Sequence, residues 1–439
     1  MPLYIAVIIL AMAAALTACD NFNQSLKPEI EYNGSVEPAH DAAGLQAAIN
    51  AIPPGGSGTV TVMRSFTLGA PVEIGGNRAV TLEAYSGTIT VAVLTRGAGF
   101  DGSFFDVQSG ASLSLRGDRE KGTLVLDGAS TSGYATALVT VSGGALTLGD
   151  RATLRNNTGV YRGGVYVENG GSFTMTGGEI SGNTVTGSGQ GAGVSVYNGS
   201  FTMTGGKITG NASMQYDGGG VAVNGDNGSF TMRGGTITGN SAAYGGGGVS
   251  FSGNSFIMSG GTIAHNTATG YGGGGGVYFS GDTFTMTGGT ITYNTVTSDG
   301  SGGGVRGGGG GGFTMTGGTI AYNTVTGTGE GGGGVYVEGG SFTMTGGTIA
   351  GNTGTGCGGG VYAAWGSFSK SGGGIIYGDT DATHTLGSNE NPAAGGPANG
   401  HAVYYSGGSG KYYRNATLGA DEGISTDTLP GDMTNWIKK

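Results

Sequence analysis

The sequence predicts an all-β protein, a single right-handed parallel β-helix of about a dozen coils with a short N-terminal capping helix. The main observation is a nine-residue phrase, SFTMTGGTI at residues 341–349, which occurs seven times with small changes. Its phenylalanines lie 26 to 29 residues apart, and repetition at such a period is typical of solenoids. Glycine supplies 103 of the 439 residues, without the Gly-X-Y period of collagen.

Each repeat contains two segments in which apolar residues alternate and a third, shorter apolar segment. In Phe-Thr-Met-Thr the phenylalanine and methionine face one side, because side chains alternate along a strand. The Val-x-Val segments follow the same rule, and Gly, Asn and Ser separate the segments. These patterns predict three short strands per coil. The aligned phenylalanines are Phe173, Phe201, Phe230, Phe256, Phe284, Phe313 and Phe342, with a weaker copy at Phe368.

Repetition has a physical reason. A single coil buries about five apolar side chains, worth roughly 1.5–3 kcal/mol each, whereas ordering its backbone costs about 1–2 kcal/mol per residue. A lone coil is therefore unstable, and stacked coils place like residues over like. The asparagine that follows each phrase then predicts an internal column of amides with a structural role. Its members are Asn183, Asn211, Asn240, Asn266, Asn294, Asn323 and Asn352.

The repeats also divide the chain. Residues 160–377 hold the clean repeats, and degenerate copies extend the predicted solenoid to residues 40–412. Leu45, Ala48, Ile49 and Ile52 share one face of a predicted helix that covers the first coil. Residues 20–39 are expected to form a flexible tether, and residues 413–439 a C-terminal cap or tail.

Residues 1–19 read as an export signal. An apolar stretch, Leu3–Leu16, is too short to span a membrane and ends in Leu16-Thr17-Ala18-Cys19. This ending resembles a bacterial lipobox, although no Lys or Arg precedes the apolar stretch. The resemblance implies cleavage before Cys19 and attachment of the protein to a membrane through lipid on that cysteine. An ordinary secretory signal with an incidental cysteine is the alternative.

The repeat words themselves resemble a known superfamily. The Gly-Gly-Val and Ile-x-x-Asn words are similar to those of the pectate-lyase-like right-handed β-helix proteins. They resemble the repeats of chlamydial polymorphic outer-membrane proteins, and more closely the Gly-rich repeat lipoproteins of spirochaetes. One departure is the isoleucine that stands where the chlamydial Asn word has phenylalanine. The resemblance implies a location on the bacterial outer membrane or cell surface, with a periplasmic or secreted protein as the alternative.

Candidates for catalysis are few. Charged residues make up 10% of the chain, and Asp299 and Glu330, at matching corners of neighbouring coils, form the best pair for a retaining glycosidase. Two solvated loop charges are the simpler interpretation. The four histidines are scattered, so neither a metal site nor a cofactor is predicted. The net charge of −10 argues against a nucleic-acid partner.

Outward aromatic residues are the stronger signal, and they are candidates for contact with sugar or protein. They could equally be ordinary strand residues, because tyrosine is common on β-surfaces. One set precedes the glycine run of three coils, a second replaces the glycine before the column asparagine, and a third occupies the centre of Val-x-Val. The sets are Tyr216, Tyr244 and Tyr271; His265, Tyr293 and Tyr322; and Tyr278, Tyr336 and Tyr362.

Together these features predict a non-catalytic, lipid-anchored surface protein that acts in adhesion or interaction. Its partner is expected to be a glycan or a protein of a host or neighbouring cell. One alternative is a carbohydrate-active β-helix enzyme, a polysaccharide lyase or glycoside hydrolase. A second is ice binding through ranks of Thr-x-Thr pairs such as Thr174 and Thr176.

Overall fold

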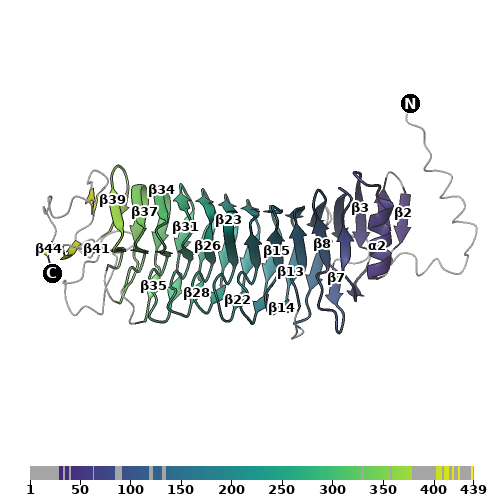
Figure 1. Cartoon of the computed structure of the whole chain (residues 1–439), viewed down its shortest axis with the longest axis horizontal. Helices are drawn as coiled ribbons and strands as arrows, with labels where there is room; N and C mark the ends of the chain where they lie inside the picture. The colour runs from purple at the N-terminus through teal and green to yellow at the C-terminus, as the bar shows by residue number, and fades with distance from the viewer. Residues whose placement is uncertain are drawn as a thin grey trace, which may run out of the picture.

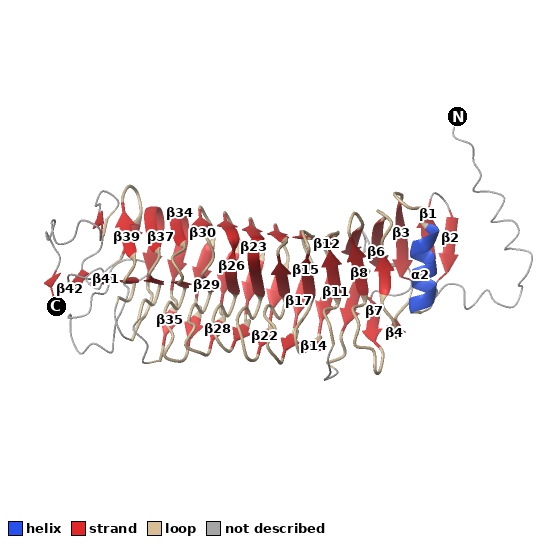
Figure 2. Ribbon diagram, in the orientation of Figure 1, coloured by secondary structure: helices blue, strands red, loops and turns tan. Residues whose placement is uncertain are grey.

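The protein is a parallel β-solenoid of the right-handed type, as the sequence predicts. The computed structural model describes residues 29–32, 35–38, 41–62, 64–84, 91–117, 122–130, 135–327, 331–355, 358–377, 402–407, 410–414, 418–419, 424–425 and 437–438. Its strands stack along the long axis of a rod, with the only described helix at the N-terminal end (Figures 1 and 2).

Three long stacks of parallel strands form the walls of the solenoid, and each is named here after its inward residue. The Val face contains β5 (Val72–Ile74), β8 (Phe105–Gln108), β11 (Val139–Ser142), β15 (Val165–Glu168), β19 (Val194–Tyr197), the first parts of β23 (Val221–Met232) and β26 (Val249–Met258), β29 (Val277–Phe279), β33 (Val305–Gly307), β36 (Val335–Glu338), β38 (Val361–Ala364) and β41 (Val403–Gly407).

The Phe face follows in each coil. It contains β3 (Ser57–Val62), β6 (Ala79–Ala84), β9 (Ser112–Arg116), β12 (Ala145–Leu148), β16 (Ser172–Met175), β20 (Ser200–Met203), the second parts of β23 and β26, β30 (Thr283–Met286), the first parts of β34 (Gly312–Ala321) and β37 (Ser341–Ala350), and β39 (Ser367–Lys370).

The Ile face comes next. It contains β4 (Phe66–Leu68), β7 (Val91–Arg96), β10 (Thr123–Asp127), β13 (Ala152–Arg155), β17 (Glu179–Ser181), β21 (Lys207–Thr209), β24 (Thr236–Thr238), β27 (Thr262–Ala264), β31 (Thr290–Thr292), the second parts of β34 and β37, and β40 (Ile375–Ile376).

A fourth stack, the short face, was not predicted. Its two-residue strands follow the column asparagines and pair in parallel from coil to coil. They are β14 (Thr158–Gly159), β18 (Thr184–Val185), β22 (Ala212–Ser213), β25 (Ser241–Ala242), β28 (Thr267–Ala268), β32 (Thr295–Val296) and β35 (Thr324–Val325).

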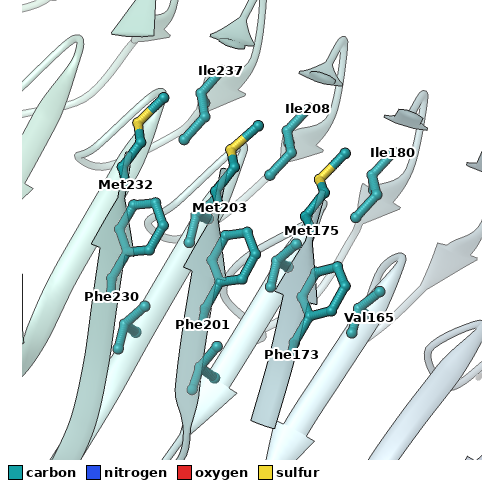
Figure 3. Close-up of a cluster of buried hydrophobic side chains, with 14 of the residues drawn as sticks. Val165, Phe173, Met175, Ile180, Phe201, Met203, Ile208, Phe230, Met232 and Ile237 are labelled. Atoms are coloured by element: carbon teal, nitrogen blue, oxygen red, sulfur yellow. The ribbon is translucent and has the colours of Figure 1, made fainter. Parts of the chain in front are cut away.

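The core consists of like residues stacked on like. Phe201 pairs in register with Phe230, and their ring centroids lie 4.9 Å apart with nearly parallel planes. Rows of phenylalanine, methionine and isoleucine run side by side through the interior (Figure 3). Because each row continues from coil to coil, the solenoid buries its apolar side chains without a central layer from elsewhere in the chain.

The column asparagines are buried and bonded to one another. The backbone N–H and the Nδ2 of Asn240 each donate to Oδ1 of Asn266 at 3.0 Å, and Nδ2 also donates to the carbonyl of Ile208 at 3.0 Å. The same arrangement recurs from Asn183 to Asn352. Each Oδ1 accepts from the preceding coil, so the amide dipoles are aligned along the rod.

A buried cation ends this column. Nη2 of Arg96 donates to Oδ1 of Asn157 at 2.9 Å, while Nη1 donates to the carbonyls of Phe100 and Gly102 at 3.0 and 2.6 Å. Arg96 is 4% exposed, and burial lowers its pKa to about 10 despite the nearby charge of Asp101. The guanidinium therefore meets the oxygen end of the aligned amides.

The helix α2 (Ala42–Ala51) covers the N-terminal end. The Asp41 side chain accepts from the N–H of Gly44 at 2.8 Å and caps the helix, while Leu45 and Ile49 are buried as predicted. The amide of Gln46 bonds to both backbone groups of Glu73 in β5, at 2.9 and 2.6 Å. The helix thus satisfies part of an otherwise open strand edge.

Antiparallel strands cover both ends, which the sequence patterns did not predict. Within the segment expected to be a tether, β1 (Glu29–Tyr32) pairs with β2 (Ser35–Pro38) and with β3. In the segment that follows the solenoid, β42 (Gly410–Arg414) pairs with β41 and with β44 (Ile437–Lys438), and β43 (Ile424–Ser425) pairs with β39. The Phe stack therefore ends on an antiparallel strand at both ends of the rod, and the Val stack does so at the C-terminal end.

Candidate binding surface

His265, Tyr293 and Tyr322 form a stacked column on the outside of the rod, here called the aromatic column. It lies where the Ile face turns into the short face, one residue before each column asparagine. The ring centroids are 5.1 and 5.0 Å apart, with planes 3° and 9° from parallel. At this spacing each ring covers part of the next, so the column turns ring edges and polar ring atoms outward.

The backbone under this column is strained. All three residues have φ of 55°, in the left-handed region, whereas Gly182, Gly210, Gly239 and Gly351 occupy the same position in other coils with φ of 60° to 65°. A non-glycine residue in this region costs on the order of 1–3 kcal/mol. Because glycine fits this position in four other coils, the fold does not require a ring here. The three successive rings therefore strain the backbone without being needed for packing.

Threonines flank the aromatic column, and formal charge is absent beside it. Residues 262–272, 290–298, 319–327 and 348–355, which carry the column and both its borders, contain no Asp, Glu, Lys or Arg. The hydroxyls of Thr269 and Thr326 donate to carbonyls of the preceding coil at 3.3 Å, which fixes their side-chain rotamers. The result is a regular, neutral strip that repeats once per coil.

Tyr216, Tyr244 and Tyr271 are exposed but do not form a second ring stack. Their exposed fractions are 42, 48 and 68%, and none of the ring contacts found among the described residues joins them. Their backbones are adjacent, since the N–H of Tyr244 donates to the carbonyl of Tyr216 at 3.4 Å. They are three separate aromatic side chains on one edge of the Val face.

Two of the three Val-face tyrosines are buried, although the sequence predicts that they point outward. Tyr336 and Tyr362 are 5% and 4% exposed, and their rings meet edge to face at 72°. The glycine run before each Val-face strand folds over that strand: a Cβ on Gly332 would lie 2.8 Å from Cβ of Tyr336. The loop therefore covers side chains that strand alternation places on the outside.

A polar cluster on the Val face was not found from sequence. Arg306 pairs with Glu338 at 2.9 Å, donates to the carbonyl of Gly272 at 2.6 Å, and lies over the rings of Tyr278 and Tyr336 at 5.9 and 5.5 Å. Its one sequence signal is an arginine at a position where the other clean repeats have Ser, Ala or Tyr.

Asp217 belongs to the same region. Its Oδ1 accepts from the N–H of Gly245 at 2.8 Å, and its Oδ2 accepts from Nε2 of Gln190 at 3.3 Å. Burial raises the pKa of Asp217 to about 6, although the Gly245 bond and the charge of Arg306 lower it. Burial likewise raises the pKa of the Tyr278 hydroxyl. Asp217 and Arg306 therefore interact electrostatically across this region, while the buried Nε of Arg306 has no hydrogen-bond partner among the described residues.

Of the remaining predicted site residues, only Asp299 lies in the described part of the chain. Asp299 is exposed, and Glu330 lies outside the described residues, as do Cys19 and Cys357. Within the described part of the chain, no group of His, Cys, Asp and Glu has the arrangement of a metal site. Among the described residues, no helix combines the length and the apolar character that a membrane span needs.

A recess in the N-terminal coils also escaped the sequence analysis. It has a volume of about 440 Å³ and lies between the Phe and Ile faces, lined by Arg116, Asp150, Arg151 and three hydroxyl side chains. Arg116 is paired there with Glu83 at 3.0 Å. Degenerate repeats hid this site, because the coil that holds Asp150 and Arg151 lacks the phrase by which the later coils align.

Comparison with models of protein families, with curated proteins and with solved structures found no match to this chain. The fold and the geometry of its surface are therefore the basis for assigning a function.

Proposed function

We propose that this protein is a non-catalytic, lipid-anchored surface protein that binds an extracellular partner through the aromatic column. The carrying observation is that His265, Tyr293 and Tyr322 occupy a left-handed backbone position where four other coils have glycine. Strained residues persist where function outweighs their cost to stability, and they concentrate at binding and catalytic sites. The partner is a glycan or a protein of a host or neighbouring cell.

The location rests on sequence alone. The apolar start and its Leu-Thr-Ala-Cys ending favour a lipid on Cys19, which would place the solenoid outside the cytoplasm, at the bacterial outer membrane or cell surface. The resemblance to Gly-rich repeat lipoproteins and polymorphic outer-membrane proteins supports the same location. Substituting Cys19→Ala should abolish labelling by a fatty-acid analogue and move the protein out of the membrane fraction. Unchanged labelling would remove the lipid anchor from the proposal.

A binding screen tests the function. The purified protein is applied to arrays of glycans and of extracellular-matrix proteins, beside the triple variant His265→Asn/Tyr293→Asn/Tyr322→Asn. Asparagine is the conservative choice, because Asn156 already holds φ of 56° at the same corner position. Tyr197→Asn is the matched control, since Tyr197 is 51% exposed and Tyr293 49%, but Tyr197 lies on the Val face. Partners of wild type and control that the triple variant fails to bind support the proposal, and binding unaffected by the triple substitution refutes it.

The enzymatic alternative keeps one concrete test. Carboxylates on adjacent coils would suit a retaining glycosidase, and the superfamily that the repeats resemble includes polysaccharide lyases and hydrolases. Release of sugar from a polysaccharide panel by wild type, lost in Asp299→Ala or Glu330→Ala, would establish that alternative. No release by the wild-type protein removes it.

Ice binding is the second candidate, favoured by the threonine ranks. On the Phe face Thr176 and Thr204 donate to carbonyls of the preceding coil at 3.3 and 3.4 Å, which gives their side chains a common orientation. Shaping of ice crystals by the purified protein would support it. Ordinary crystal growth in its presence would leave binding of a macromolecular partner as the proposal.

A further inference from the structure

At the recess between β9, β12 and β16, two corner residues differ from those of the later repeats, and one of them strains the backbone. Counted from the last inward residue of each Phe-face strand, the third residue is Arg151 in one coil and glycine in the seven coils that follow, all with positive φ. Arg151 has φ of 56°, where an arginine is strained and glycine is not. The preceding residue is Asp150, where the next coil has Gly177. A corner that glycine would form readily thus carries two charged side chains.

The lining of the recess is rich in hydrogen-bond donors. Ser114 and Thr147 are paired residues on adjacent strands, and their outward side chains lie next to each other. Arg116 directs Nε and Nη2 to the same oxygen of Glu83, both at 3.0 Å, so its Nη1 lies outside that ion pair. The lining thus holds two guanidinium groups, of Arg116 and Arg151, and guanidinium groups make strong charge-assisted hydrogen bonds with oxyanions.

The recess is also large enough for a ligand group. Its volume of about 440 Å³ lies within the range of about 300–1,000 Å³ that is usual for small-molecule sites. It opens on the side of the rod, and it lies in the N-terminal coils, away from the aromatic column. Its lining side chains come from three successive coils, which the strand stacking holds in fixed register.

We propose that this recess binds an oxyanion group, a carboxylate, sulfate or phosphate, of an extracellular ligand. Arg116 and Arg151 supply charge-assisted donors, and Ser114 and Thr147 supply neutral ones. Asp150 lies at the corner and accepts from a hydroxyl group beside the oxyanion. This site is independent of the partner that the aromatic column binds, and each proposal stands without the other.

Calorimetric titration of the full purified protein with inorganic phosphate, sulfate and acetate, at constant ionic strength, tests the proposal. Saturable binding of at least one anion is expected, with affinity falling as sodium chloride is raised. Asp150→Gly/Arg151→Gly should weaken binding about tenfold or more. This variant should still fold, because Gly177 and Gly178 form the same corner in the next coil. Arg116→Gln, which leaves the corner untouched, should also weaken binding.

Arg233→Thr is the control, since Arg233 is exposed on the same face and Thr204 holds its position in the coil before. The control should bind like wild type. Preference among the three anions identifies the oxyanion class. The proposal is overturned by the absence of saturable binding of all three anions, or by equal binding in wild type and both recess variants.

Discussion

At the scale of single residues, each coil can be compared with the other coils of the same protein. Most coils show what the fold requires at a given position, so a residue that departs from the others can be judged by its cost. Tyr293 and Arg151 both hold a positive φ where neighbouring coils have glycine. Departures of this kind, more than outward position alone, separate candidate functional residues from ordinary strand residues.

Replacing Tyr293 by asparagine should leave stability nearly unchanged. The lost ring contacts cost about 0.5–1.5 kcal/mol per pair, and relief of the left-handed strain offsets a similar amount. The free energy of unfolding, measured by chemical denaturation, should therefore change by less than about 1 kcal/mol. Tyr293→Val should be clearly less stable than Tyr293→Asn, because a β-branched residue tolerates positive φ poorly. Equal stability of the two variants would contradict the strain argument.

Asp217 should make stability depend on pH. Burial raises its folded pKa to about 6, above the ordinary value of 3.8, so the folded protein binds the proton more tightly than the unfolded chain. Its contribution is most favourable below the unfolded value and declines as the pH rises through about 6. Asp217→Asn should remove this decline, about 1 kcal/mol after allowance for partial exposure. Unfolding of both proteins at pH values from about 4 to 7 measures the difference, and parallel curves would contradict it.

At the scale of elements, the asparagine column connects coils that otherwise share only strand pairing and apolar contact. Each member both donates and accepts, so the column is complete only when every coil contributes. Buried amides that lose a partner are costly, because neither water nor another side chain replaces it. The column therefore fixes the height of each turn relative to its neighbours.

Asn266→Ala should destabilise the protein by about 2–4 kcal/mol, since it leaves the N–H and the Nδ2 of Asn240 without their shared acceptor. Asn227→Ala, at an exposed position between the two paired parts of β23, is the control and should have little effect. Equilibrium unfolding in urea compares the two. A small effect at Asn266 would show that water or a shifted neighbour satisfies those donors.

Arg96→Met should destabilise by at least about 2 kcal/mol, because it removes the donor to Oδ1 of Asn157 and to the carbonyls of Phe100 and Gly102. Methionine keeps much of the apolar contact with Phe104, so the loss measures the hydrogen bonds. Thermal unfolding followed by circular dichroism provides the measurement. An unchanged midpoint would mean that the end of the amide column needs no cation.

Much of this organisation could be predicted from sequence, and the failures have physical causes. The stacking of Phe201 on Phe230 follows from the repeat, because the same residue recurs at the same position of successive coils. The two-residue strands of the short face are too short for alternation to reveal. Burial of Tyr336 depends on a loop that folds over the strand, and the approach of Asp217 to Arg306 depends on stacking across several coils. Such contacts depend on the shape of the corners between strands, and that shape cannot be predicted from the repeat period or the amino-acid composition.

At the scale of the whole molecule, coils are interchangeable where their register is the same. Strand pairing puts Ser200 over Ser229 and Phe201 over Phe230. A complete repeat can therefore be removed, and residues of the same kind will still stack on one another in the remaining coils.

Deletion of residues 201–229, which joins Ser200 to Phe230, should give a folded rod shorter by about 4.8 Å. Deletion of residues 201–214 should abolish folding, because Val-face residues would then follow the Phe-face position. Circular dichroism and small-angle scattering distinguish the two. A folded product from the second deletion, or an unfolded one from the first, would sink the like-over-like account of the core.

The antiparallel strands at the two ends of the rod affect how copies of this protein associate. A bare parallel edge is a template on which the next molecule can continue the same pattern, and growth then depends on concentration. Here β1 lies on β3, while β42 and β43 lie on β41 and β39. A second molecule that approaches either end finds an antiparallel strand there, and its own parallel coils cannot continue the stack on that strand. The length of the rod is consequently fixed by the number of repeats in the chain, and concentrated protein should pack such rods side by side without joining them end to end into fibres.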